Sequence, residues 1–77
     1  MKAYIPAPQS REVILAVVAA AGPEGATTGR IHDALGQAWV TNWPDVTEGM
    51  IRYLAREGQL REQHELSEGE PRWVLST

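Results

Sequence analysis

Histidines beside acidic residues are the first candidates for chemistry in this 77-residue chain. His32 precedes Asp33, and His64 precedes Glu65; imidazole and carboxylate groups are common metal ligands. Neighbouring side chains point in different directions on a helix or a strand, and the two histidines lie in separate predicted elements, so we expect no metal site. The chain has no cysteine, which excludes a thiol nucleophile, a disulfide and a Cys-based zinc site.

Motifs for catalysis or phosphate binding are also missing from the sequence. No serine lies in a nucleophile-elbow motif. Gly22, Gly25 and Gly29 lack both the lysine of a P-loop and the G-x-G-x-x-G spacing. We therefore expect neither an enzyme nor a cofactor.

The most regular spacing of polar and apolar residues lies between Asp45 and Gly58. Helical periodicity places on one face, toward the core, Val46, Met50, Tyr53 and Leu54. The opposite face carries Asp45, Glu48, Gly49, Arg52 and Arg56. Pro44 suits the first position of a helix, and Gly58 suits a left-handed C-cap. The stretch predicts a helix over 45–58 with a polar outer face.

The length and composition are those of one small domain. It can form a core without disulfide bonds, because 43% of its residues are hydrophobic. The longest apolar run, Val13 to Ala21, has nine residues and is too short to span a bilayer. Pro6 and Pro8 interrupt any signal-peptide pattern near the N-terminus. We expect a cytoplasmic protein with no membrane partner.

The net charge is −3, and the acidic excess lies in the second half of the chain. Residues 59–77 contain only two basic residues, Arg61 and Arg72, against Glu62, Glu65, Glu68 and Glu70. DNA-binding modules usually concentrate lysine and arginine where the phosphates lie. The charge distribution therefore argues against DNA as a partner.

Two further helices are predicted before residue 45. Residues 1–9 read as an extended arm because of their prolines. Ser10 is the expected N-cap of a first helix that runs to about Ala21, where Gly22-Pro23 ends it. A short strand is possible at 24–26. Thr27 or Thr28 should cap a second helix over 28–35, closed by Gly36.

The remaining elements are a connection and a hairpin. The connection, 37–43, carries two large aromatic residues, Trp39 and Trp43. Apolar and polar residues alternate over 60–66, which is typical of a strand. A turn at 67–70 and a second strand at 72–75 follow, with Trp73 and Leu75 facing the helices.

The order of three helices and a hairpin resembles the winged helix-turn-helix family. The matching series are ATTGRIHDAL, VTEGMIRYLAREGQL and RWVL, and IRYLAREGQL (Ile51 to Leu60) is the most specific part. The resemblance covers about Ser10 to Leu75. It implies a mainly α fold of three helices with a small antiparallel β-hairpin, as one domain over 10–77 behind the arm 1–9. Small bacterial and phage regulators, including pilus-operon regulators, have this layout.

The resemblance implies a small DNA-binding transcriptional regulator that applies the helix 45–58 and the wing 60–75 to double-stranded DNA. The implied contacts are Thr47, Glu48 and Arg52 with base edges, Arg56 with a phosphate, and Arg61 and Arg72 on the wing. Arginine can bind guanine, and glutamate can accept a hydrogen bond from cytosine. Alternatively, Glu48 and Arg52 form an ordinary surface pair at i, i+4 spacing.

The second hypothesis is an acidic winged-helix module that binds a protein partner, such as a phage-encoded inhibitor or adaptor. Trp39 and Trp43 are its candidate contacts, since tryptophan is enriched in interface hot spots. We expect one of them to be buried and Trp39 to be the better contact. Tyr4 and Ile5, together with the first helix, are the expected contact of a homodimer. The acidic turn 65–70 is either a solubilising surface or a further partner contact.

The two hypotheses differ in the surface that they require. DNA binding gains if Arg11, Arg30, Arg52 and Arg56 gather on one surface. Partner binding gains if Asp45 and Glu48 interrupt them.

Overall fold

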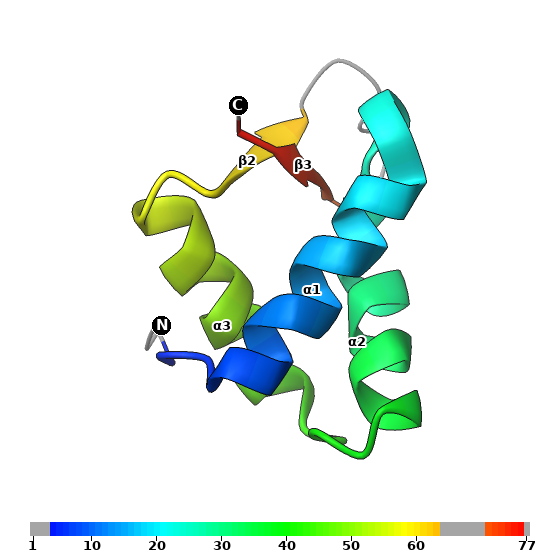
Figure 1. The fold of residues 1–77 in the computed structure, drawn as a ribbon, viewed down its shortest axis with the longest axis vertical. Helices are drawn as coiled ribbons and strands as arrows, with labels where there is room; N and C mark the ends of the chain where they lie inside the picture. Colours follow the sequence, from blue (N-terminus) through cyan, green and yellow to red (C-terminus); the bar gives the residue numbers. More distant parts are fainter. Residues whose placement is uncertain (1–3, 64–70, 77) are drawn as a thin grey trace.

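A computed structural model describes residues 4–63 and 71–76. Within these residues, three helices and a three-stranded antiparallel sheet form a winged-helix-like layout (Figure 1). The elements are α1 (Pro8–Ala21), the short 3-10 helix η1 (Gly22–Glu24), β1 (Ala26–Thr27), α2 (Thr28–Gln37), α3 (Pro44–Arg56), β2 (Leu60–Gln63) and β3 (Arg72–Leu75). The expected fold class is confirmed.

The sheet has the strand order β1-β3-β2, so the last strand of the chain lies in the middle. Ala26 pairs with Trp73, and Leu60 pairs with Leu75. The expected short strand is therefore present, at Ala26–Thr27. The end of the strand predicted over 60–66, the turn at 67–70, His64 and the acidic residues of that turn lie outside the described residues.

The core lies where the three helices meet the sheet. Its buried side chains include Ile14, Val18, Ile31, Leu35, Met50, Ile51, Leu54, Leu60 and Trp73. The indole Nε1 of Trp73 donates a hydrogen bond of 3.1 Å to Thr28 Oγ1, so its polar atom is satisfied inside the core. Core positions for Met50, Leu54 and Trp73 are confirmed. Ile51 is fully buried as well, because α3 packs against both α2 and β2.

The first helix begins earlier than predicted. Pro8 occupies its first turn and Ala7 is the N-cap, with an extended backbone at ψ 159°. Proline fits the first turn because the amide there has no helical partner, and it favours an extended residue before it. Ser10 is therefore not a cap; it lies inside α1 and is buried. The extended arm ends at Ala7 rather than at Gln9.

The second helix ends later than predicted. Thr27 is its N-cap, as expected, because its Oγ1 accepts from the Arg30 amide at 3.1 Å. Gly36 does not close the helix, which runs to Gln37. A Cβ at Gly36 would lie 3.2 Å from Asn42 Oδ1, so this glycine lets the following connection pass close by. The left-handed residue at the end of α2 is Trp39, at φ 60°.

The third helix matches its prediction closely. It begins at Pro44 and ends at Arg56. Gly58 has φ 82°, and the Gln59 amide donates to the Leu54 carbonyl at 2.9 Å. This is the six-residue closure of a Schellman motif, with glycine at the left-handed position. The predicted C-cap role of Gly58 is confirmed.

Candidate functional site

The outer face of α3 lacks the threonine that the winged-helix resemblance implies there. Thr47 is completely buried, and its Oγ1 lies 2.7 Å from Nδ1 of His32 on α2. Position 47 lies one turn before Ile51 and therefore shares its core-facing side. The prediction that Thr47 contacts DNA is wrong, because its hydroxyl joins α2 to α3 inside the protein. The role of His32 in this contact was missed.

Gly49 is also absent from the exposed face of α3. It is buried, and its carbonyl accepts a hydrogen bond of 3.1 Å from the Tyr4 amide. The N-terminal arm lies beside α3 (Figure 1). The predicted exposure of Gly49 is wrong because the arm covers it.

The remaining charged residues of α3 are acidic in its first half and basic in its second half. Glu48 Oε1 and Arg52 Nη2 are 3.3 Å apart, which confirms the surface-pair alternative at i, i+4 spacing. Arg56 and Asp45 are exposed. Arg11 on α1 is paired with Glu57 at 2.9 Å. Two of the four arginines whose clustering would favour DNA, Arg11 and Arg52, are therefore in ion pairs with acidic residues.

The two wing arginines face away from the core side of the sheet. The register pairs Arg61 with Val74 and Gln63 with Arg72, so these four share the sheet face opposite Leu60. The Gln63 side-chain amide donates to the Pro23 carbonyl at 3.4 Å, which places η1 against this face. Arg61 lines a hollow of about 290 Å³ beside the end of α1. The wing cations thus lie near η1 and α1.

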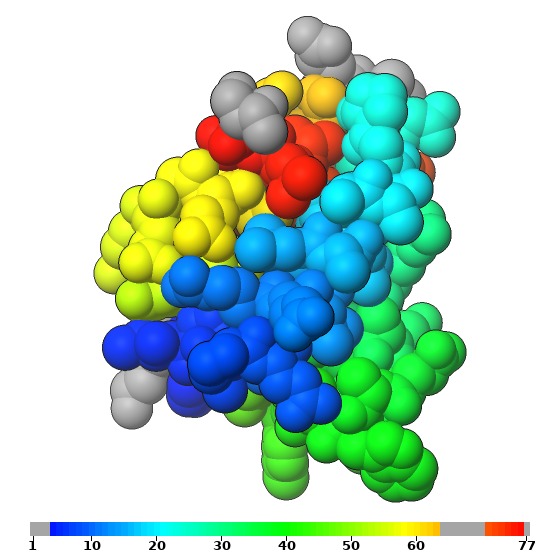
Figure 2. Space-filling view, in the orientation of Figure 1, coloured from blue at the N-terminus to red at the C-terminus, as the bar shows by residue number. Residues whose placement is uncertain are grey.

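The α2–α3 connection, residues 38–43, carries the largest exposed aromatic groups; we call it the tryptophan connection. Trp39 is 93% exposed and Trp43 is 73% exposed. The prediction that one of them is buried is therefore wrong. Together with Val40, Thr41 and Asn42 they line a hollow of about 220 Å³. Figure 2 shows this green segment projecting from the lower end of the molecule, opposite the wing.

Both tryptophans occupy helix-terminal positions that favour other residue types. Trp39 has a left-handed backbone, at the position that Gly58 holds in the equivalent turn after α3. In the turn after α2, the Val40 amide donates a hydrogen bond of 2.9 Å to the Leu35 carbonyl. Trp43 is the N-cap of α3 and makes no side-chain cap bond, where serine, threonine, aspartate or asparagine is preferred. Neither core packing nor local backbone preference accounts for these tryptophans.

The N-terminal arm adds two exposed hydrophobic side chains. Tyr4 is 40% exposed and Ile5 is 76% exposed, while the next residue, Pro6, is buried and anchors the arm. Figure 1 shows the arm and the tryptophan connection in the half of the molecule away from the sheet. All four large exposed hydrophobic residues of the described chain are on these two segments.

In the part of the chain that the structure describes, no three His, Cys, Asp or Glu side chains come together. Every helix of residues 4–63 and 71–76 is too short or too polar to cross a lipid bilayer.

Comparisons of the chain with protein-family models, with curated proteins and with solved structures gave no match.

Proposed function

We propose that this chain is a protein-interaction module that binds its partner through the tryptophan connection, with Tyr4 and Ile5 of the arm as additional contacts. One observation carries the proposal. Trp39 and Trp43 are both exposed, and each stands at a helix end where another residue type would be more stable. A function in binding would account for exposed indoles at these two positions.

The chemistry of the surface defines the kind of partner. Tryptophan supplies a large, rigid apolar area and is among the residues that dominate binding energy when they enter a pocket. Asp45 follows directly in the first turn of α3, and the chain has a net charge of −3. The partner that fits is a protein with an apolar pocket and a basic rim, because charge complementarity favours the encounter.

In-cell photo-crosslinking tests this proposal. A photoreactive amino acid at Asn42, which is exposed within the connection, should give a crosslinked protein in cells of the source organism. The combined change Trp39→Gly and Trp43→Ser should remove that product, because both indoles are lost while each new residue suits its backbone position.

The matched control is the combined change Arg52→Ala and Arg56→Ala, which alters α3 and leaves the tryptophans in place. It should leave the crosslinked product unchanged. A product that survives loss of both tryptophans, or one that disappears in the arginine variant, would overturn the proposed binding surface.

DNA binding is the second candidate, favoured by the winged-helix-like layout and by the exposed Arg56 on α3. A regulator built on this chain would read bases with Glu48 and Arg52 once their mutual ion pair opens. Arg56, Arg61 and Arg72 would be its phosphate contacts. Thr47 has no place in this hypothesis because it is buried.

A further inference from the structure

The outward surface of α1 is apolar over more than half of its length. Ala16, Ala19 and Ala20 are exposed, and no charged residue occurs from Val13 to Ala21. A surface helix normally turns charged or polar residues to the solvent. This helix face therefore has the composition of a surface that another molecule covers.

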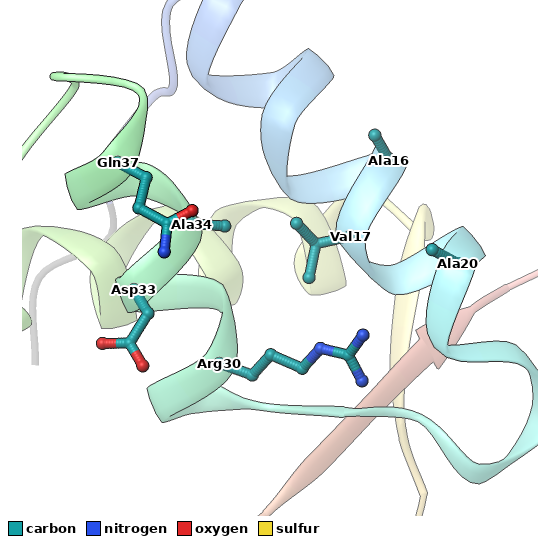
Figure 3. A pocket seen from close by; sticks show the side chains of 7 residues that line it. All are labelled: Ala16, Val17, Ala20, Arg30, Asp33, Ala34 and Gln37. Carbon is teal, nitrogen blue, oxygen red and sulfur yellow. The ribbon is translucent and has the colours of Figure 1, made fainter.

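The same face of α1 forms one wall of a groove, the α1–α2 groove. Its volume is about 480 Å³, and its lining includes Ala16, Val17 and Ala20 of α1 and Arg30, Asp33 and Ala34 of α2. Figure 3 shows Val17 and Ala34 pointing toward each other across the floor. The Arg30 side chain extends toward α1, and Asp33 projects from the other side of α2 (Figure 3).

We propose that a second copy of this chain occupies the groove, in a two-fold contact of α1 and α2 with the same helices of the other copy. A two-fold contact requires a surface that is complementary to itself. The apolar floor meets this condition because it can pack on an identical floor. The charged residues at the rim are also complementary to themselves, since Arg30 of each copy can pair with Asp33 of the other.

The charges of Arg30 and Asp33 favour a second copy over a partner that is uniformly basic or uniformly acidic. Among the described residues, neither the Arg30 guanidinium nor the Asp33 carboxylate takes part in an ion pair. A uniformly basic or acidic partner would bury one of these two groups against a like charge, which disfavours association. A second copy neutralises both. The inference is independent of the proposed partner at the tryptophan connection, which the dimer would carry twice.

Sedimentation velocity from about 5 to 500 µM tests the dimer with two charge-reversal variants, Arg30→Asp and Asp33→Arg. Each variant alone should dimerise at least about tenfold more weakly than the original chain, because like charges meet across the two-fold axis. An equimolar mixture of the two variants should form a heterodimer with close to the original affinity, since opposite charges then meet at both positions. Restoration by mixing is specific to a contact between copies.

Two further variants make the outcome decisive. Ala16→Glu places a charge on the apolar face at an exposed position and should give a monomer that is still folded by circular dichroism. Arg56→Asp, which has the same charge change as Arg30→Asp, should leave the dimer intact. A chain that is monomeric at every concentration overturns the proposal. So does a dimer that Ala16→Glu and Arg30→Asp do not weaken, because its contact would lie on another surface.

Discussion

Trp39 shows how a single residue can set local stability against binding. Its backbone is left-handed, at φ 60°, a conformation that costs an L-residue roughly 1–2 kcal/mol and glycine very little. Its side chain is 93% exposed, so packing within the chain does not offset that strain. The equivalent position after α3 is a glycine, Gly58.

Trp39→Gly is therefore expected to stabilise the fold while it removes a binding residue. The strain relieved exceeds the extra flexibility of glycine in the unfolded chain, and the free energy of unfolding should rise by about 0.5–1 kcal/mol. Thermal unfolding should move upward by a few degrees, since 1 kcal/mol corresponds to about 4–8 °C at this chain length.

Gly58→Ala is the matched control for this change. A Cβ at Gly58 would meet nothing within 4 Å, so the substitution adds only left-handed strain and should lower stability by a similar amount. A Trp39→Gly variant less stable than the original chain would contradict our account, because the indole would then be a packing residue.

Thr47 belongs to the core, and its hydroxyl should matter for stability alone. Thr47→Val keeps the shape but leaves His32 Nδ1 without the partner that now lies 2.7 Å away. We expect a loss of about 1 kcal/mol in urea unfolding, the usual net value of such a hydrogen bond. The crosslinked product obtained at Asn42, measured in parallel, should not change. A stable variant that loses an activity of the α3 surface would contradict the buried assignment.

Residue roles on α3 were predicted only in part. The periodicity identified Met50 and Leu54 as core residues and Arg52 and Arg56 as exposed ones, because large apolar and charged side chains determine the faces of a helix. Thr47 and Gly49 were misplaced because both are small. Thr47 shares the side of Ile51 at i+4 spacing, but the predicted core face of Val46, Met50, Tyr53 and Leu54 left this side out. The burial of Gly49 depends on the N-terminal arm, which helical spacing does not reveal.

At the scale of the elements, Gly25 fixes how the turn before β1 meets the sheet. Its φ is +84°, and a Cβ there would lie 2.9 Å from the Trp73 carbonyl oxygen and 3.2 Å from Val74 Cγ1. Two independent penalties, backbone strain and steric overlap with β3, therefore oppose any side chain at this position.

Gly25→Ala should consequently destabilise the fold by more than Gly22→Ala. Both glycines have a positive φ, but a Cβ at Gly22 would meet nothing within 4 Å. We expect about 1 kcal/mol for Gly22→Ala from strain alone, and about 1–3 kcal/mol more for Gly25→Ala from the overlap. Chemical denaturation of the two variants measures the difference. Equal losses would show that the η1 turn can move away from β3.

Helix ends were predictable where a residue with a special backbone requirement marks them. Pro44 and Gly58 delimit α3 in this way, and Thr27 caps α2. The start of α1 and the end of α2 were missed for a common reason. Ser10 and Gly36 are residue types that commonly cap helices. In this fold, however, Ser10 is buried inside α1, and Gly36 lets the connection pass close to α2. Both are effects of tertiary packing.

For the whole molecule, the distribution of charge separates the two proposed functions. Arg11 and Arg52 are in ion pairs with Glu57 and Glu48, Arg30 lines the α1–α2 groove, and the wing arginines lie toward η1. The large exposed hydrophobic side chains of the described residues lie instead on the arm and the tryptophan connection, in the half away from the sheet. The net negative charge could be predicted from the sequence, but the positions of the arginine side chains on the folded surface could not.

The most direct test of a partner-binding rather than a DNA-binding surface is fluorescence anisotropy of a labelled random duplex at about 50 mM salt. Non-specific DNA binding comes from clustered cations and typically has dissociation constants near 10⁻⁴–10⁻⁶ M. We expect no saturation below roughly 100 µM, either for the original chain or for the combined Arg52→Ala and Arg56→Ala variant. Binding tighter than about 10 µM that weakens with salt, and that this variant loses, would contradict it and assign the surface of α3 to DNA.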